Sequence, residues 1–181
     1  MAKELPSIEV LRNLMRYEPD TGKLFWLPRT WDMFTPRKRP ASHVCANWNS
    51  ANAGKEAFTA KNRYGYRVGR IFDSQYYSHR ICWALFYGKE PLYEIDHING
   101  IRCDNRIENL RDVSRSINMR NSSKRSHNTS GYNGVTWSDQ IQRWTARIGS
   151  KHIACCKTKE EAIKARIDAE RHLGFTARHG K

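Results

Sequence analysis

The chain has 181 residues, 39% of them hydrophobic and 11% aromatic, and 32 Lys and Arg against 18 Asp and Glu give it a net charge of +14. The length allows one domain or two small ones, and the aromatic content argues against an unstructured chain. A positive charge of this size attracts polyanions, so nucleic acid is the expected partner; a solvated basic surface and a membrane surface are the alternatives.

The sequence also argues against a membrane or secreted protein. No run approaches the roughly 18 apolar residues that a membrane span needs, and residues 1–14 lack the apolar core of a signal peptide. The five cysteines are odd in number and form no C-x-x-C pair, which argues against a disulfide framework or a cysteine-rich zinc site. Free thiols in such a chain indicate a reducing cytoplasm.

The first part of the chain is expected to contain a helix, a strand and a long loop. Residues 7–17 predict a short helix that Ser7 caps, with its apolar residues on one face. A turn at 19–22 leads into a strand at 24–26. Residues 27–55 hold three prolines and a basic run, and we expect a long irregular loop there.

A hairpin and a buried helix are predicted next. Residues 66–71 alternate in polarity, a turn follows at 73–74, and residues 75–77 form the returning strand. Residues 79–87 are apolar almost all round, which predicts a buried helix that ends at Gly88.

The segment around Asp96 and His97 carries the clearest chemical signal, just before an Asn-Gly turn. Because adjacent strand residues point to opposite faces, both reach one site only where the strand ends or bulges. Aspartate is a hard oxygen ligand suited to Mg²⁺ or Mn²⁺. A histidine of ordinary pKa, about 6.5, accepts a proton from water near neutral pH.

A second strand and a helix are expected downstream of this pair. The strand reaches Val113, and Ser114 caps a short helix through Met119 that carries Asn118. The whole segment therefore predicts strand, loop, strand and helix. The amide oxygen of Asn118 is a further hard donor that adds no charge.

Several polar residues of this region also have a purely structural interpretation. Asn105 and Asn109 favour hydrogen bonds to turn backbone, and His79 begins an apolar helix, which favours a structural role. Asp96 and His97 alone could be a turn former and a surface histidine, but the asparagines downstream argue against this. No partner pattern assigns a catalytic role to His43, His127, His152, His172 or His179.

This block resembles the HNH endonuclease family, whose active site is a ββα-metal fold. The residues that carry the resemblance are His79-Arg80, Asp96 to Gly100, Asp104 to Arg106, Asn109 to Arg111 and Asn118. The resemblance implies that His97 is the general base and that Asn109 braces the loop behind it. It also implies that Asp96 and Asn118 hold the metal. Asn118 stands where many members have histidine. Asparagine at this position is typical of phage nicking and homing enzymes and favours Mg²⁺ as the metal, with Mn²⁺ as a substitute.

The last third of the chain predicts a separate small unit. Residues 122–130 have the polar composition of a linker. Three short strands are expected after it, at 132–137, 143–148 and 151–156. Thr158 then opens a helix, in which Glu161 completes a capping box, and the helix ends at Gly174. The packed face of this helix is expected to hold Ala162, Ala165, Ala169 and Leu173.

This C-terminal unit resembles the apetala-type (ethylene-response-factor) DNA-binding domain. The resemblance is carried by residues 128–137, 143–148 and 158–162. By alternation Arg143, Thr145 and Arg147 share a face that would enter a DNA major groove, while the helix covers the face of Trp144. Thirteen Lys and Arg against five Asp and Glu follow residue 118, and a merely solvated basic face is the alternative. The residues expected to bind DNA are Arg143, Thr145, Arg147, Lys151, Arg106, Arg111, Lys124 and Arg125.

The expected fold class is α+β. It combines a ββα-metal HNH nuclease core and an N-terminal α/β extension with a small C-terminal domain of a three-stranded sheet and a helix. The expected boundaries are 1–121 for the extension and nuclease, with its core at 79–121, then 122–130 for the linker and 131–177 for the apetala-like domain. Residues 17–26 and 48–55 are also similar to segments found upstream of the nuclease block in phage HNH proteins.

The expected function is that of a metal-dependent DNA endonuclease of homing type that nicks DNA and leaves 5′-phosphate and 3′-hydroxyl ends. A single constellation predicts one strand cut per binding event by a monomer, with a dimer as the alternative. The expected partner is double-stranded DNA, with no membrane and no small-molecule substrate, in the cytoplasm of a phage-infected bacterial cell. A DNA-binding regulator with an inactive nuclease block and an RNA-directed nuclease are the alternative interpretations.

Overall fold

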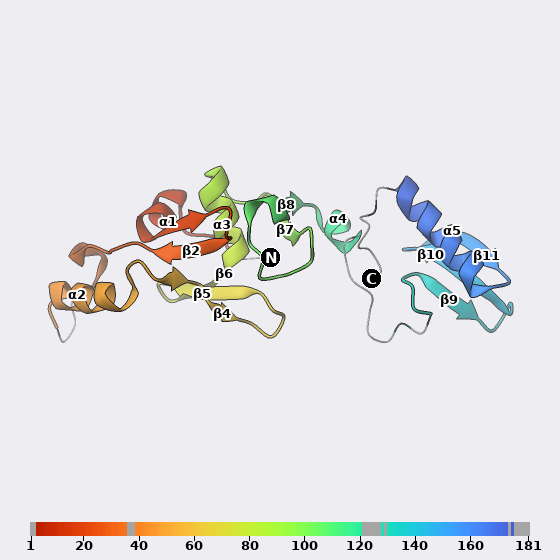
Figure 1. The fold of residues 1–181 in the computed structure, drawn as a ribbon, viewed down its shortest axis with the longest axis horizontal. Coiled ribbons are helices and arrows are strands. Elements are labelled where there is room, and N and C mark those ends of the chain that lie inside the picture. The colour runs from red at the N-terminus through yellow and green to blue at the C-terminus, as the bar shows by residue number, and fades with distance from the viewer. Residues whose placement is uncertain (1–2, 36–38, 121–127, 129, 174, 176–181) are drawn as a thin grey trace. The chain divides into compact units, whose positions relative to one another are not determined.

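The computed structural model describes residues 3–35, 39–120, 128, 130–173 and 175. The chain divides into two compact units, residues 1–113 and 114–181, each of which is described here by itself (Figure 1). Helices and small antiparallel sheets occur together, so the predicted α+β class is confirmed. Within the described ranges, no helix is long and apolar enough to cross a membrane. The predicted linker lies mostly outside the described residues, and the predicted domain boundaries stay predictions.

The first unit begins with a helix and a three-stranded antiparallel sheet. The elements are α1 (Ile8–Leu14), β1 (Met15–Glu18), β2 (Lys23–Trp26) and β3 (Glu56–Ala57). The Ser7 hydroxyl accepts a hydrogen bond from Val10 N at 3.3 Å, so the predicted cap is confirmed. The predicted helix over 7–17 is three residues too long, because Met15 already pairs with Trp26 in the sheet and is buried there.

The predicted long loop over 27–55 is wrong in its second half. It contains a short 3₁₀ turn (Trp31–Met33) and a helix of twelve residues, α2 (Ala41–Asn52). The Asn49 amide donates to Arg29 O and accepts from Arg29 N, both at 2.8 Å, and thereby ties the helix to the preceding chain. The Arg29 guanidinium also lies 3.8 Å from the ring centre of Trp48. These contacts add to the burial of Ala41 and Cys45 on the inner face of the helix.

A second antiparallel sheet leads into the central helix of this unit. Its strands are β4 (Ala60–Lys61), β5 (Arg67–Ile71) and β6 (Ser74–Tyr77), followed by α3 (Ser78–Tyr87). The predicted hairpin is confirmed, but Ile71 pairs with Ser74, so the turn is Phe72-Asp73, one residue earlier than predicted. Gly88 has φ +68° and caps the helix in the left-handed region, as predicted.

One hydrophobic core holds the first unit together and carries the two strands of the central segment. These are β7 (Glu94–His97) and β8 (Leu110–Val113), which pair antiparallel, with a 3₁₀ turn (Ile107–Asn109) before β8. Ile95 and Leu110 place both strands in that core. Its other fully buried members are Leu11, Met15, Leu24, Ile71, Ile81, Cys82 and Ala84.

The second unit contains a short helix, a three-stranded sheet and a longer helix. The elements are α4 (Arg115–Arg120), β9 (Val135–Ser138), β10 (Arg143–Ile148), β11 (Lys151–Cys156) and α5 (Lys159–His172). The sheet has the order β9-β10-β11, and α5 lies across it in Figure 1. The Thr158–Glu161 capping box is confirmed, while the predicted helix end at Gly174 lies outside the described residues.

The packed face of α5 differs from the expected row of alanines. Ala162 is buried as expected, but the next residues buried on the same face are Arg166 and Glu170, and Leu173 is exposed. Arg166 Nη2 lies 3.0 Å from Glu170 Oε1, and the Tyr132 hydroxyl donates to Glu170 Oε2 at 2.8 Å. Charged side chains can be buried when they are paired in this way. A pattern of apolar residues along a helix does not predict such buried charges.

We expect Gly134→Ala to destabilise the second unit by about 1–3 kcal/mol, measured by thermal and denaturant unfolding of the full chain. Gly134 has φ +73°, and a Cβ there would lie 2.3 Å from Arg147 O and 2.9 Å from Arg166 Nε. Gly131→Ala is the matched control, because its φ is +81° and nothing lies within 4 Å of its Cβ position. Equal losses in the two variants would contradict the close packing at Gly134.

Candidate active site

His97 is the last residue of β7, and the chain turns sharply after it. Gly100 N donates to His97 O at 2.8 Å, and Ile98 N donates to Asn109 O at 2.9 Å. The side chains of both Asp96 and His97 are largely buried, with exposures of 8% and 3% for the two residues. The strand therefore ends at the pair, which is the condition under which neighbouring residues reach one site.

A polar and aromatic shell surrounds the His97 ring. Its Nε2 lies 3.1 Å from Asn105 Oδ1, and Asn105 Nδ2 donates to Ser78 Oγ at 3.1 Å. The His79 ring lies edge-on with its centre 5.2 Å from that of His97, and the Tyr66 ring centre lies at 5.8 Å. These contacts hold the imidazole from several directions.

Burial lowers the pKa of His97 below its usual range, while the hydrogen bond with Asn105 and the carboxylates of Asp96 and Asp104 partly oppose this effect. His97 is therefore neutral at neutral pH and retains a lone pair that accepts a proton.

Asp96 is held by Arg111, its partner across the two strands. Arg111 Nε and Nη2 both donate to Asp96 Oδ2, at 2.9 and 2.7 Å. The Asp96 side chain is only 9% exposed, so this guanidinium offsets a buried negative charge. Arg111 was expected to bind DNA; in the structure it orients the carboxylate that is expected to hold the metal.

The loop between β7 and β8 is braced by Asn109. Its Oδ1 accepts from Asn99 N at 2.9 Å, and its Nδ2 donates to Asp104 O at 2.8 Å. Both contacts are made with backbone atoms of the loop that follows His97. This geometry is compatible with the bracing role expected for Asn109, which stays a prediction.

Arg106, the other arginine of this segment expected to bind DNA, is engaged within the same loop. Its Nε and Nη2 donate to the two carboxylate oxygens of Asp104, at 2.9 and 2.8 Å, and its Nη1 lies 2.9 Å from Glu108 Oε1. Hydrogen bonds from Arg106 lower the pKa of Asp104 to about 2. Arg106 is thus paired with two carboxylates of its own loop.

The β1–β2 hairpin supports this loop from a distant part of the sequence. The Tyr17 hydroxyl donates to Asn105 O at 2.7 Å, and Ile107 N donates to Pro19 O at 3.1 Å. A Cβ on Gly22 would lie 2.5 Å from Arg106 N, so only glycine allows the turn to approach so closely. Sequence reasoning assigned no role to this upstream segment.

Sequence reasoning therefore missed the roles of four side chains around His97. Asn105 and His79 received structural interpretations, and Ser78 and Tyr66 were not singled out. Nothing in the spacing of Asn105 from His97 indicates a side-chain contact between them. The position of His79 at the start of an apolar helix predicts burial correctly, since only 7% of it is exposed.

The donor set expected for the metal fits a hard divalent cation by its chemistry. Asp96 supplies a buried carboxylate and Asn118 an amide oxygen, the ligand types that Mg²⁺ prefers. Asn118 lies on α4 in the second unit, and its role as a ligand stays a prediction. Among the described residues no cluster of three His, Cys, Asp or Glu side chains is placed to hold a metal.

The residues expected to bind DNA in the second unit lie on its sheet. Arg143, Thr145 and Arg147 alternate along β10 with Trp144 and Ala146, and Ala146 packs against Ala162 of α5. The helix therefore covers the predicted face of the sheet. Lys151 begins β11 and is exposed. The predicted contacts at Lys124 and Arg125 lie outside the described residues.

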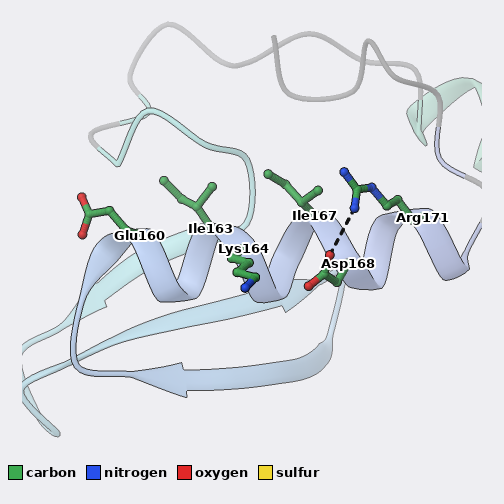
Figure 2. Close-up of a pocket in the computed structure, with 6 residues that line it drawn as sticks. All are labelled: Glu160, Ile163, Lys164, Ile167, Asp168 and Arg171. Carbon is green, nitrogen blue, oxygen red and sulfur yellow. Dashed lines mark hydrogen bonds and ion pairs between the residues drawn. The ribbon is translucent and has the colours of Figure 1, made fainter.

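A shallow pocket on α5 offers no comparable chemistry. Figure 2 shows that its lining comes from one helix: Glu160, Ile163, Lys164, Ile167, Asp168 and Arg171. Its one dashed contact joins Arg171 Nη1 to Asp168 Oδ1 at 3.5 Å, and both side chains are about half exposed or more. An exposed ion pair of this kind stabilises little and indicates no catalytic site.

Comparison with known proteins agrees with this location of the site. Residues 76–120 match the family model of HNH endonucleases. The match covers about a quarter of the chain and supports a nuclease enzyme. The family implies that DNA is the substrate, and HNH nucleases typically use a divalent metal ion. It contains β7, β8 and α4 together with Ser78, His79 and Asn105. No curated protein and no solved structure matches the chain.

We expect stability of the first unit to fall as pH decreases from about 7 towards 4, with less decline in a His79→Phe variant. Burial, His97 and Arg80 lower the pKa of His79 from 6.5 to about 3, and its Nδ1 has no hydrogen-bond partner among the described residues. The unfolded chain therefore binds a proton in this pH range that the folded chain does not bind, which favours unfolding at low pH. The difference between the proteins should reach about 3 kcal/mol or less at pH 4.

Denaturant unfolding of the two full-length proteins at pH 7 and pH 4, followed by tryptophan fluorescence, measures this effect. Phenylalanine keeps an aromatic ring of similar shape but does not titrate, so the comparison isolates the proton. An identical loss of stability in both proteins would show that His79 does not titrate on unfolding.

Proposed function

We propose that the protein is a metal-dependent DNA endonuclease that cuts one strand of duplex DNA and leaves 5′-phosphate and 3′-hydroxyl ends. The observation that carries the proposal is the buried His97 at the end of β7, beside Asp96, within the segment similar to HNH endonucleases. We further propose that β7, β8 and α4 form a ββα-metal core and that the C-terminal sheet and helix form an apetala-like DNA-binding domain.

In this proposal His97 acts as the general base. It takes a proton from a water molecule, whose oxygen forms a bond to the scissile phosphorus while the bond from phosphorus to the 3′ oxygen breaks. The leaving oxygen collects a proton from solvent. The fixed orientation of the ring favours this transfer.

Asp96 and Asn118 would hold Mg²⁺, for which Mn²⁺ can substitute. When bound, the cation neutralises the charge that develops on the phosphate and on the leaving oxygen. Arg111 prepares Asp96 for this role by fixing its carboxylate through two hydrogen bonds. Asn109 maintains the loop after His97 through its two contacts with loop backbone.

We propose that a monomer nicks DNA, because the sequence carries one set of active-site residues of the kind formed by Asp96, His97 and Asn118. Double-strand breaks would need a dimer or two successive nicks. The contribution of the second unit would be to anchor DNA through the exposed face of β10. A homing role in the cytoplasm of phage-infected bacteria is the setting that we propose for this activity.

We expect wild-type protein with Mg²⁺ to relax supercoiled plasmid, and His97→Ala to lower the rate by at least about 100-fold because the base is lost. His43→Ala is the control and should cut at the wild-type rate, since His43 lies on the exposed side of α2. EDTA should abolish cutting. If wild-type protein binds DNA but leaves plasmid intact with either Mg²⁺ or Mn²⁺, the chain is a DNA-binding regulator instead.

We expect Arg147→Ala to weaken duplex binding and to reduce the slope of log K against log salt by about 1, because one phosphate contact is lost. Arg147 is exposed on β10, opposite the face that α5 covers. Lys164→Ala on α5 removes the same charge from the other side and is the control. An equal change of slope in both variants would mean that net charge, and not this face, determines binding. Competition with duplex RNA tests the preference for DNA.

A further inference from the structure

The Asn105 side chain forms a hydrogen bond with the His97 ring. The role inferred for this contact rests on the proposed function of His97 as the general base. Asn105 is 1% exposed, and its Oδ1 lies 3.1 Å from His97 Nε2. We propose that Asn105 is a positioning residue that keeps the hydrogen of neutral His97 on Nε2. The lone pair is thereby held on Nδ1, which is the nitrogen that takes the proton from water.

The direction of the contact follows from a chain of hydrogen bonds. Asn105 Nδ2 donates to Ser78 Oγ at 3.1 Å, which leaves the amide oxygen facing His97. The Ser78 hydroxyl is then an acceptor from Asn105, and its oxygen also lies 3.8 Å from Cys82 Sγ, a contact in which either group can donate. Burial raises the pKa of the Cys82 thiol to about 12, so it stays uncharged and suits the end of such a chain.

Because Asn105 Oδ1 can only accept a hydrogen bond, its contact with His97 Nε2 favours one tautomer of the imidazole. A neutral histidine has one N–H and one nitrogen with a lone pair. An oxygen that only accepts, placed at Nε2, stabilises the form with hydrogen on Nε2 and lone pair on Nδ1. A buried hydrogen-bonded chain stabilises one arrangement more strongly than an exposed contact would.

Asn105 itself is held in place by its surroundings. The Tyr17 hydroxyl donates to Asn105 O at 2.7 Å, and Gly22 packs directly on the backbone at Asn105 and Arg106. On the other side, the edge-on ring of His79 limits rotation of the His97 ring. Asn105 therefore acts on the ring of the base, whereas Asn109 acts on the loop backbone, and the two asparagines have separate roles.

Nitrogen NMR of the histidine rings tests the tautomer directly. In metal-free full-length protein, long-range ¹H–¹⁵N spectra should show His97 with hydrogen on Nε2, its signals being identified by their loss in His97→Ala. Asn105→Ala should shift His97 towards a mixture of tautomers, and Asn105→Asp, which keeps an oxygen at this position, should preserve the Nε2–H form. Hydrogen on Nδ1 in the wild type, or an unchanged tautomer in Asn105→Ala, would overturn the proposal.

Ser78→Ala supplies a second variant in case Asn105→Ala fails to fold. It leaves the Asn105 side chain present but removes the acceptor of Nδ2, so the amide is free to turn. We expect a partial shift of the same tautomer equilibrium. A tautomer identical to the wild type in folded Ser78→Ala would contradict the hydrogen-bonded chain. This measurement needs no cleavage, so it decides the tautomer even if the proposed nuclease activity is absent.

Cleavage kinetics then separate positioning from a general loss of structure. With wild-type activity established, single-turnover cleavage by Asn105→Ala should slow by about 10- to 100-fold while its Kd for DNA stays within twofold. Asn49→Ala is the matched control, because it also removes a hydrogen-bonded amide, whose partners are Arg29 and Cys45 rather than groups near His97. Two results would refute a positioning role. One is equal slowing of cleavage in both variants, and the other is an Asn105→Ala variant that binds DNA more weakly but cleaves bound DNA at the wild-type rate.

Discussion

The close packing of the β1–β2 turn against the backbone of residues 105–107 supports the rest of the candidate site. Gly22 approaches this backbone so closely that a single methyl group would collide with it, and Tyr17 and Pro19 add hydrogen bonds on either side. Tyr17 and Asn105 lie 88 positions apart in the sequence. Ile98 and Ile101 of the loop after His97 are exposed and do not anchor it in the core, so its conformation depends in part on this distant hairpin. The N-terminal extension is thus part of the framework of the site.

Charge is distributed within this framework in a way that net charge conceals. Asp96 is paired with Arg111 and Asp104 with Arg106, so two arginines of the nuclease segment neutralise carboxylates of the protein itself. In the second unit Arg166 is buried against Glu170. An arginine that is paired and partly buried has less free energy to gain from a phosphate than an exposed one. The grip on DNA that we propose therefore rests on exposed residues such as Arg147 rather than on every basic residue.

Local rules of sequence predicted much of the fold. The Ser7 cap, the Gly88 helix end and the Thr158–Glu161 capping box all depend on residues close together in the chain, and all three are present. The order of strand, loop, strand and helix around His97 was predicted for the same reason. Such features need no knowledge of the packing partner.

The failures share a different cause, which is contact between distant segments. Helix α2 was predicted as a loop because its stability depends on contacts with Arg29, Trp26 and Phe34, all outside the helix. The inward face of α5 was predicted as alanine, but Glu170 is buried there because Tyr132, 38 positions away, donates a hydrogen bond to it. Asn105 was given a turn role since neither Ser78 nor Tyr17 is near it in sequence.

The same comparison explains why an amide suits the position beside the base. A carboxylate at Asn105 would also accept the hydrogen of His97 Nε2, but a site 1% exposed would have to bury its full charge. An amide supplies an oxygen acceptor without charge. Its NH₂ group also donates a hydrogen bond to Ser78 Oγ, which an ionised carboxylate could not do. Orientation of the ring is thereby separated from the electrostatics of the site. The negative charge remains on Asp96, where Arg111 already offsets it and where the proposed cation would bind.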